Sequence, residues 1–361
     1  MKITLGEVGT YINGYAFKPS DWGTRGLPII RIQNLTNQNI VPNYFDGPYN
    51  PKFEVNKGDI LIAWSGSLGI HIWQKNRALL NQHIFRVEFN KCDIDKMYFY
   101  YAVKYNIHKM LHLTHGATMK HIIKSDFEQI VVPYPSLDVQ AKISKILNYL
   151  EQNIINYRNI LLKLELLIKS RFVDLFGDIE LNEKKWKKIR FGELINSANN
   201  GLARRGNDQD GNIVLRLIEL QENFINYSGP NRILLTDDEK KRYRLLEGDL
   251  LFARVNGNPK NVGRCATFYE CEEQVYHNDH IIRTSCDKSQ LDSVFAAYLF
   301  NSEYGKNRIS KKIKTSAGQY TINQEGLKSI EIILPPIGIQ YSFAKLVKQI
   351  NKLKFAKIVY N

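Results

Sequence analysis

The amino-acid sequence predicts an α+β protein made of two tandem, pseudo-symmetric domains, each built from short strands and helices with long loops. A long coiled-coil helix is predicted after each domain, and the two helices are expected to pack antiparallel. Three observations support this fold class. Several segments of the first half recur in the second half. Short apolar runs alternate with Gly, Asn and Pro, as strands and turns do. Apolar residues after each copy then follow the three-and-four spacing of a coiled coil.

The duplication appears as matched segments in a constant order. The pairs are Leu5–Val8 with Phe191–Leu194, Gly26–Leu35 with Gly211–Leu220, Lys57–Ile62 with Glu247–Phe252, Asn81–Arg86 with Asn278–Arg283, and Pro135 and Gln140 with Pro335 and Gln340. Their separation drifts slowly, as small loop insertions would cause, whereas chance matches would scatter. A duplicated module with divergent loops indicates one protein that makes two related but non-identical contacts.

The two globular domains are expected at residues 1–135 and 190–335. The elements predicted within them are strands at Ile29–Ile32, Asp59–Ala63 and Ile130–Val132, and helices at Met97–Leu113 and Asp292–Ser302. Gly58-Asp59 and Gly248-Asp249 are interpreted as turns that lead into strands.

A long central helix is predicted at residues 136–177, because Ser136 or Asp138 favours a helix start and Gly177 favours a stop. Its apolar seam consists of Leu147, Leu150, Ile154, Tyr157, Leu161, Leu164 and Ile168. At about 1.5 Å per residue such a helix is roughly 58 Å long, enough to hold two globules apart.

The second copy of this helix is predicted at residues 336–361. Its seam consists of Ile339, Phe343, Leu346, Ile350 and Leu353. Because the sequence stops at Asn361, this helix is expected to be shorter than its twin, whether by natural truncation, by trimming or as a family trait. Both helices are expected to join the two halves and to offer an outer face to partners. Residues 178–189 are predicted to be a short basic linker, a solvated tether with phosphate contact as its alternative role.

The 361-residue chain is strongly basic, with 50 Lys plus Arg against 36 Asp plus Glu and a net charge of +14. A surplus of this size favours a polyanionic partner, because neutralised phosphates release counterions. We expect no membrane partner, since the sequence has no basic amphipathic helix, lipid anchor, transmembrane-length apolar run or signal peptide. The four cysteines lack CxxC spacing, which favours free thiols in a reducing cytoplasm.

The usual catalytic signatures are missing. The sequence contains no G-x-G and no G-x-x-x-x-G-K-[ST], which argues against a glycine loop for dinucleotides or S-adenosylmethionine and against a P-loop motor. Glu183-Lys184-Lys185 has the letters of a nuclease motif but falls in the linker. No metal site is expected, because His108, His112 and His115 lack acidic partners at helical spacing. These absences predict a binding protein without a cofactor of its own.

Further segments carry a family resemblance beside the pairs given above. They are Asn13–Lys18, Pro28–Leu35, Val131–Pro135, Arg216–Leu220 and Ile333–Pro336. No single motif is specific, but the ordered and duplicated set, followed each time by a heptad helix, covers nearly all of the chain. In this arrangement the sequence resembles the specificity (S) subunit of Type I restriction-modification enzymes.

The resemblance implies a division of labour between subunits. Each globular half would be a target recognition domain that reads one half of a bipartite target in double-stranded DNA. The helices would set the spacer and recruit two modification (methyltransferase) subunits and the restriction (motor and nuclease) subunits, in a bacterial or archaeal cytoplasm. S-adenosylmethionine, Mg²⁺ and ATP would bind to those partner subunits. The chain itself would bind no cofactor and catalyse no reaction.

Loops that follow the shared strands are the candidate DNA-binding sites, because strands supply a scaffold and loops carry function. In the first domain the candidates are Tyr15, Lys18, Ser65, Ser67, Gln82, His83, Met119, Lys120 and His121. In the second domain they are Arg204, Arg205, Arg254, Asn256, Asn258, His280, Lys312, Lys314, Gln319 and Tyr320. Each of these has a solvated surface charge or a turn residue as its alternative interpretation. For Asn81 and His83, and for Asn278 and His280, recurrence in both copies favours structural hydrogen bonds over sequence readout.

Two other functions stay open at this point. One is a catalytic DNA-modifying or DNA-cleaving chain with a degenerate site. The other is a coiled-coil scaffold without a role on DNA, which the net charge of +14 makes less suitable. Salt-dependent DNA binding would separate the scaffold from a DNA reader.

Overall fold

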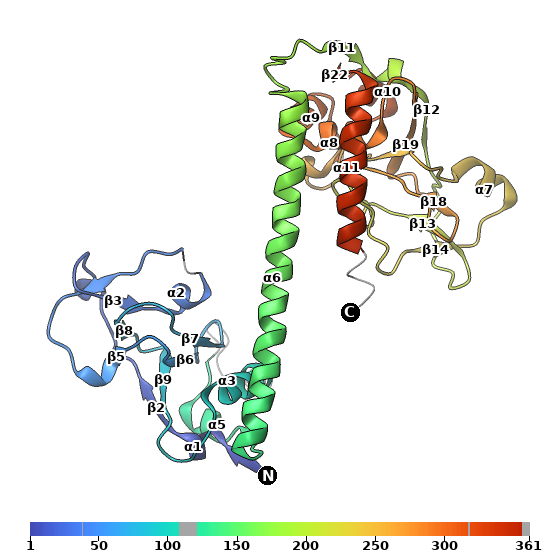
Figure 1. Ribbon diagram of the computed structural model, residues 1–361. Helices are drawn as coiled ribbons and strands as arrows, with labels where there is room; N and C mark the ends of the chain where they lie inside the picture. The colour runs from blue at the N-terminus through green and yellow to red at the C-terminus, as the bar shows by residue number, and fades with distance from the viewer. Residues whose placement is uncertain (38, 108–120, 317, 356–361) are drawn as a thin grey trace. The chain divides into compact units, whose positions relative to one another are not determined.

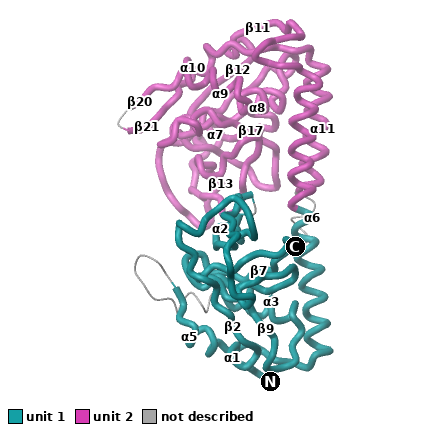
Figure 2. Tube along the Cα trace, turned by 90° about the vertical axis from the view of Figure 1, so that its left-hand side faces the viewer, with its two compact units in different colours: residues 1–157 teal, residues 158–361 magenta. Residues whose placement is uncertain are grey.

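The computed structural model describes residues 1–37, 39–107, 121–316 and 318–355. The chain divides into two compact units, residues 1–157 and 158–361, which are coloured teal and magenta in Figure 2. Each unit holds one copy of the predicted repeat. Within the described residues, no helix combines the length and the apolar character that a membrane span needs.

Unit 1 is built on two four-stranded sheets, ordered β2-β9-β6-β7 and β4-β3-β8-β5. The first, antiparallel sheet contains β2 (Thr10–Asn13), β9 (Ile84–Glu88), β6 (Ile60–Ala63) and β7 (Gly69–Ile72). The second contains β4 (Tyr44–Phe45), β3 (Leu27–Ile30), β8 (Ala78–Leu80) and β5 (Glu54–Val55), with β3 and β8 parallel. A separate ladder joins β1 (Lys2–Thr4) to β10 (Val131–Pro133). Inner strand β6 is buried along its whole length, which explains its unbroken apolar sequence.

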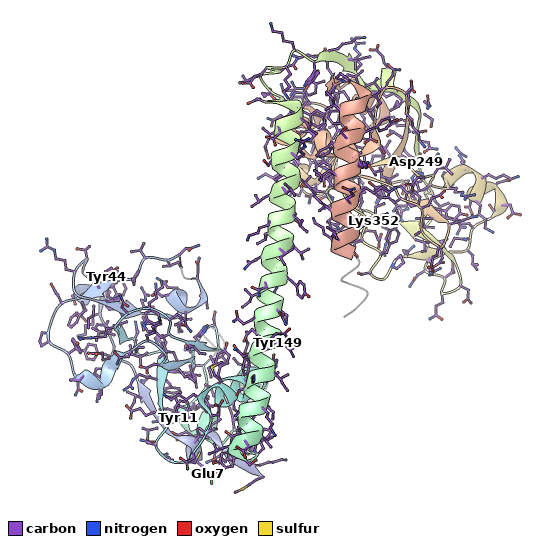
Figure 3. The ribbon with its side chains drawn as sticks, viewed as in Figure 1. Glu7, Tyr11, Tyr44, Tyr149, Asp249 and Lys352 are labelled. Atoms are coloured by element: carbon purple, nitrogen blue, oxygen red, sulfur yellow. The ribbon has the colours of Figure 1, made fainter. Side chains whose placement is uncertain are left out.

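Apart from the long helix described below, the described helices of unit 1 are short and pack against the sheets, where their apolar side chains join the same hydrophobic clusters (Figure 1). They are α1 (Leu5–Val8), α2 (Ile32–Thr36), α3 (Lys96–Tyr105) and α5 (Lys124–Glu128), with 3-10 turns η1 (Pro19–Asp21) and η2 (Pro51–Phe53). The core gathers Leu5, Tyr11, Phe85, Phe99 and Phe127. The hydroxyl of Tyr11, labelled in Figure 3, donates to the carbonyl oxygen of Leu5 at 2.8 Å, so this buried phenol is satisfied.

Two predicted elements of unit 1 end earlier than expected. The strand expected at Ile29–Ile32 ends at Ile30, because the N–H of Arg31 donates to Oδ1 of Asn34 at 3.0 Å and the chain turns into α2. The helix expected at Met97–Leu113 is described as α3, which ends at Tyr105. Residues 108–113 of that expectation lie outside the described residues.

Unit 2 repeats the plan of unit 1. Its four-stranded sheet has the order β12-β19-β15-β17, with β12 (Ile195–Asn200), β19 (Ile281–Cys286), β15 (Leu250–Ala253) and β17 (Cys265–Thr267). A second sheet contains β14 (Arg232–Ile233), β13 (Asn212–Leu215) and β18 (Val275–His277), and β13 and β18 are parallel as β3 and β8 are. A ladder of β11 (Lys187–Arg190) with β22 (Glu331–Leu334) corresponds to β1 with β10. A third sheet is formed by β16 (Val255–Asn256), β21 (Gln319–Thr321) and β20 (Lys314–Ser316).

One of the described helices of unit 2 matches the helix that the sequence predicts at Asp292–Ser302. These helices are α7 (Asp237–Tyr243), α8 (Ser293–Asn301), α9 (Glu303–Ser310) and α10 (Gln324–Lys328), with 3-10 turns η3 (Phe191–Leu194) and η4 (Pro259–Asn261). Helix α8 begins after Asp292, whose side chain accepts hydrogen bonds from the N–H groups of Val294 and Phe295, both at 2.9 Å. This cap is why the predicted helix Asp292–Ser302 has nearly the observed bounds.

The long helix α6 (Leu137–Phe176) begins in unit 1 and ends in unit 2. It contains 40 residues and is therefore about 60 Å long. Gly177, with φ 76°, ends it where the sequence predicts a stop. The recurrent glutamine attaches each long helix to its own unit. Oε1 of Gln140 accepts from the N–H of Asp95 and Oε1 of Gln340 accepts from that of Asp292, both at 3.0 Å.

Helix α11 (Ile337–Phe355) packs antiparallel on the last turns of α6 within unit 2, as expected. The ring of Phe343, near the start of α11, lies 5.2 Å from that of Phe172, while Lys354 near its end pairs with Glu165 at 3.4 Å. Of the predicted seams, Ile168, Phe343 and Ile350 are buried, and Leu164 and Leu346 pack against the same core as partly buried residues. The part of the predicted distal helix at 356–361 lies outside the described residues.

Two expectations about this region are corrected. The seam residues Leu150, Ile154, Tyr157 and Leu161 are exposed and do not pack as a coiled-coil seam, because only the last turns of α6 face α11 among the described residues. Leu353 of α11 is exposed as well. The linker is shorter than residues 178–189, because Lys187 and Lys188 pair with Leu334 and Ile333 in the β11–β22 ladder.

Candidate nucleic-acid interface

One backbone turn occurs in both units, and we call it the shared turn: residues 81–83 in unit 1 and 278–280 in unit 2. The N–H of Asn81 donates to Ile30 O at 3.2 Å, and that of Asn278 donates to Leu215 O at 3.0 Å. Gln82 and Asp279 donate in the same way to Tyr15 O at 2.9 Å and Leu202 O at 3.0 Å. The frame is therefore the same in both units, as the recurring sequence predicts.

The asparagines of the shared turn are buried parts of this frame. Oδ1 of Asn278 accepts the N–H of His280 at 3.2 Å. Asn81 is equally buried, but its Oδ1 has no hydrogen-bond partner. The structural role expected for these asparagines is thus visible in the backbone hydrogen bonds of both and in the side-chain hydrogen bond of Asn278. The residues that follow them carry the difference between the units.

In unit 1 the shared turn carries uncharged polar and aromatic side chains. Nε2 of Gln82 lies 3.3 Å from Nε2 of His83, and the ring of Trp64 meets that of His83 edge-on at 5.3 Å. Burial, and then the charge of Arg31, lowers the pKa of His83, so this imidazole is neutral at pH 7. Such a group offers both a donor and an acceptor.

A cavity of about 270 Å³ opens beside this turn. Its lining includes Trp22, Arg31, Gln33, Gln82 and His83, and the guanidinium of Arg31 lies 4.7 Å from the centroid of the Trp22 ring. The cavity combines planar surfaces with hydrogen-bonding groups, which is the chemistry that nucleobases require.

The other candidates of unit 1 have different outcomes. Tyr15, Lys18 and Ser67 are exposed on the loops where they were predicted. Ser65 is a correction: only 3% of it is exposed, because it forms a β-bridge with His121, and its side chain does not face solvent. Met119 and Lys120 lie outside the described residues.

In unit 2 the shared turn carries a charged cluster centred on Asp279. Nη1 of Arg205 lies 2.8 Å from Oδ1 of Asp279, and Nη2 of Arg254 lies 3.9 Å from Oδ2. Nε of Arg254 also donates to the backbone carbonyl oxygen of Asp279 at 2.7 Å. Nη2 of Arg205 lies 3.1 Å from Nε2 of His280. Two of the predicted residues, Arg205 and Arg254, therefore meet at one carboxylate, and a third, His280, lies beside Arg205.

His280 is held as a neutral partner in this cluster. Burial lowers its pKa, and the charges of Arg205 and Arg254 lower it further, while Asp279 opposes them. A neutral imidazole accepts a hydrogen bond through Nε2, which suits the contact with Arg205. The cluster thus holds the guanidinium groups of Arg205 and Arg254, both hydrogen-bond donors, near the carboxylate of Asp279, an acceptor.

Arg204 is a correction, because it is already paired within the protein. Its Nε and Nη2 donate to the two carboxylate oxygens of Glu239, each at 2.8 Å, and Nη2 also donates to Leu234 O. The arginine lowers the pKa of Glu239 to about 2. Since Glu239 is part of the capping box of α7, Arg204 anchors this helix and is not a free donor.

Asn256 and Asn258 shape the loop that follows Arg254. Oδ1 of Asn256 accepts the N–H of Asn258 at 2.9 Å, and Oδ1 of Asn258 accepts that of Lys260 at 3.1 Å. The side-chain Nδ2 groups of Asn256 and Asn258 can therefore donate hydrogen bonds to other groups.

The β20–β21 hairpin lies beside this loop, because Asn256 pairs with Tyr320 in the β16–β21 ladder and Ile322 N–H donates to Arg254 O at 2.9 Å. Of the four hairpin candidates, Lys314 and Gln319 are exposed and Lys312 and Tyr320 are half-buried. The structure therefore brings the hairpin next to the Asp279 cluster.

Residues 146–162 of α6 form a second candidate surface, which we call the open segment. Its apolar side chains are exposed: Ile146, Tyr149, Leu150, Ile154, Ile155, Tyr157, Ile160, Leu161 and Leu162. Tyr149 is labelled in Figure 3. Within this segment, Leu147 is half-buried and lines a cavity of about 410 Å³ with Tyr98, Tyr101 and Tyr105 of α3. A concentration of exposed apolar side chains is typical of a protein-binding face.

The motif letters that suggested catalysis form no site. Nζ of Lys184 donates to the carbonyl oxygens of Asp174 and Leu175 at 2.8 and 2.9 Å, so it caps the end of α6. Across the described ranges, no group of three or more His, Cys, Asp or Glu side chains could hold a metal ion. His108, His112 and His115 lie outside those ranges.

Comparison with known proteins identifies the family. A family model for the Type I restriction modification DNA specificity domain matches residues 1–166 and 183–357. The chain belongs to this family. The two matches correspond to the two copies of the repeat, and each contains one shared turn.

Relatives of this specificity-domain protein include three specificity subunits of Type I restriction enzymes. The StySPI subunit of Salmonella potsdam is 28% identical over 255 residues, and the EcoKI subunit of Escherichia coli (strain K12) is 24% identical over 256 residues. In each case the match covers 67% of this chain and 55% of the relative, so the chain spans about half the length of these two proteins. The EcoBI subunit of Escherichia coli is 22% identical over 380 residues, which cover 97% of this chain and 79% of the relative.

Solved structures share the fold. The S subunit of a Type I restriction-modification system from M. genitalium has a TM-score of 0.65 and 15% identity, covering 98% of this chain and 89% of that one. A structure described for complex assembly and conformational transition of the type I R-M system has a TM-score of 0.51 and 14% identity, covering 100% and 93%.

Sequence reasoning about this specificity-domain protein missed two residues of the candidate interface. Asp279 holds the arginine cluster, and Trp64 occupies in unit 1 the position of Arg254. Their backbone N–H groups reveal the equivalence: Trp64 donates to His83 O at 3.3 Å, and Arg254 donates to His280 O at 2.8 Å. The mismatch of Gln82 with Asp279 inside an otherwise recurring segment was the available signal.

Proposed function

We propose that this chain is the DNA-specificity subunit of a Type I restriction-modification system, in which each unit reads one half of a bipartite target. The shared turn carries this proposal. One backbone frame presents Trp64, Gln82 and His83 in unit 1, and Arg254, Asp279 and His280 in unit 2. A repeated frame with different side chains suits two different half-sites on one duplex.

The two kinds of contact expected at a DNA interface have candidates in both units. Exposed cations such as Lys18 and Lys314 suit phosphates, which position the protein without reading sequence. Gln82 and Arg254 suit base edges, where each good bidentate contact contributes about 1–3 kcal/mol of discrimination. The net charge of +14 supports strong, salt-dependent binding.

The helices support the second half of the proposal. Helix α6, about 60 Å long, would set the spacer between the half-sites. Its open segment would recruit the modification subunits, two in a symmetric complex, and through them the restriction subunits. S-adenosylmethionine, Mg²⁺ and ATP would be bound by those subunits in the bacterial or archaeal cytoplasm, and this chain would contribute recognition without catalysis.

Selection of bound duplexes from a randomised library by the purified full chain, followed by sequencing, tests the proposal. We expect two enriched blocks separated by a fixed spacer, and an affinity that falls steeply as salt rises. Enrichment of no sequence, or binding that is insensitive to salt, would reject the proposal. Mg²⁺-dependent cleavage of the duplex by the chain alone would instead support the catalytic alternative.

A further inference from the structure

We infer that Arg205, Asp279 and Arg254 together read an adenine–thymine pair in the half-site of unit 2, and that Asp279 is the residue that rejects guanine–cytosine at this position. This inference rests on the proposed function, because it needs sequence-specific DNA binding by unit 2. It adds the identity of the base pair and a role for an acidic residue in a basic interface.

The side chains of the cluster present their hydrogen-bonding groups in a defined order. The carboxylate of Asp279 stands between two guanidinium groups, Arg205 at one oxygen and Arg254 at the other. The side chains therefore present a donor, an acceptor and a donor in sequence. In the major groove, adenine–thymine presents the acceptor N7, the amino donor N6 and the acceptor O4, which is the complementary order.

Guanine–cytosine does not match this order. Its edge presents the acceptors N7 and O6 side by side, followed by the amino donor N4 of cytosine. A central carboxylate would then face the lone pairs of O6, or one guanidinium would face the cytosine amino group. Either contact leaves like groups opposed at a desolvated interface, which costs affinity.

The two oxygens of Asp279 have different surroundings. Oδ1 is buried beside Arg205, so the exposed part of the side chain, 23% of its surface, lies away from Oδ1. Oδ2 is 3.9 Å from Nη2 of Arg254, beyond hydrogen-bond distance, and keeps acceptor capacity for an amino group. Arg254 is also fixed by its 2.7 Å hydrogen bond to the carbonyl of Asp279, which lowers the entropy lost when it binds.

The matching position in unit 1 indicates that Asp279 serves specificity and not the folding of the shared turn. Gln82 occupies the place of Asp279 in the same backbone frame, and the turn keeps its hydrogen bonds. The carboxylate is therefore not needed to form the shared turn. Its presence in unit 2 coincides with the two arginines, Arg205 and Arg254, that it separates.

The test is the same random-duplex selection, made with the full chain and with Asp279→Asn. In the parent chain we expect one block to contain an adenine–thymine pair whose replacement by guanine–cytosine lowers affinity about tenfold or more. In Asp279→Asn the amide can donate to guanine O6, so the penalty should fall below about threefold. The other block should not change. Arg205→Ala, at a side chain that is 54% exposed and safe for folding, should relax the same position.

Glu239→Gln is the matched control. This variant removes the negative charge of the Glu239–Arg204 ion pair in the same unit and keeps a side chain that can cap α7. It should therefore raise the affinity for all duplexes without changing either block. Two results would overturn the inference. One is a guanine–cytosine preference of the parent chain at the position that Asp279→Asn changes, and the other is a set of blocks that is identical in all variants. In both cases the proposed function would still stand, because the parent chain enriches two blocks. Absence of enriched blocks in the parent chain would overturn both.

Discussion

The backbone N–H of Arg254 donates to the carbonyl oxygen of His280 at 2.8 Å, which fixes the arginine at the rim of the shared turn. Its side chain then reaches back to Asp279, a residue of the same turn. The position of Arg254 is thus set by the frame that recurs in both units, while its chemistry is specific to unit 2.

Replacing Arg254 with alanine should remove discrimination in one block of the target only. We expect the preference at that position to fall by about fivefold to a hundredfold, because a bidentate or charge-assisted base contact is lost. The measurement is competition binding with duplexes changed singly in each block. Arg204→Ala is the control, since Arg204 is paired with Glu239. An equal loss of affinity on all duplexes would show that Arg254 contacts phosphate.

Replacing Gln340 with alanine should destabilise unit 2. The side chain is fully buried, accepts from Asp292 N–H, and donates to Gln290 O and Pro335 O at 3.0 and 2.7 Å. Each buried group left without a partner costs about 1–3 kcal/mol. Thermal unfolding followed by circular dichroism should show a lower transition for unit 2. The exposed Gln349 on the same helix gives the control, and Gln349→Ala should leave the transition unchanged. Equal transitions for the two variants would contradict a clamp at Gln340.

Ile154→Asp should abolish assembly with the modification subunit while the chain stays folded. Ile154 is 52% exposed in the open segment, so the charge costs little in the free chain but much in an apolar interface. Leu161→Asp should behave in the same way. Co-purification measures assembly, and circular dichroism checks the helix. Asn159→Asp adds the same charge at an exposed polar residue and should still co-purify. Normal co-purification of Ile154→Asp would remove the open segment from the partner interface.

Unit 2 should lose stability in mild acid because of His277. Burial, and then Arg283, lowers the pKa of His277 to about 4. The unfolded chain, with an ordinary histidine pKa near 6.5, binds the proton more readily, so the contribution is complete above about pH 6.5 and is lost as pH falls towards 4. The total loss is about 3 kcal/mol.

Unit 1 shows which residue can replace His277 in a variant that tests this pH dependence. Leu80 pairs with Ile30 as His277 pairs with Leu215, so the two residues occupy the same place in the parallel ladder. His277→Leu should flatten the pH dependence of the unit 2 unfolding transition between pH 6.5 and 4. An unchanged slope would assign the acid sensitivity to other groups.

The repeated frame could be predicted from sequence because it depends on local patterns. Strand β6, the helix cap at Asp292 and the stop at Gly177 all follow from a few neighbouring residues. Contacts between distant residues could not be predicted in the same way. Arg204 looks like a free reader until Glu239, far along the chain, is seen beside it. Ser65 looks like an exposed turn until its bridge to His121 covers it.

The helical seams show a similar limit. A strict three-and-four spacing selects Leu346, which packs on the core only as a partly buried residue, and omits Val347, which is buried. The reason is that α11 contacts α8 as well as α6, so its buried face is wider than a coiled-coil seam.

The placement of Phe172 and Phe176 in the core of unit 2 has a consequence for how such proteins can exchange parts. A genetic crossover at Gly177 would separate the second unit from two aromatic side chains that fill its interior, and the hybrid would inherit a mismatched core. A crossover within residues 150–161, where the apolar side chains are exposed, would leave both interiors whole. The helix therefore contains a junction at which one unit could be replaced without refitting the interior of the other.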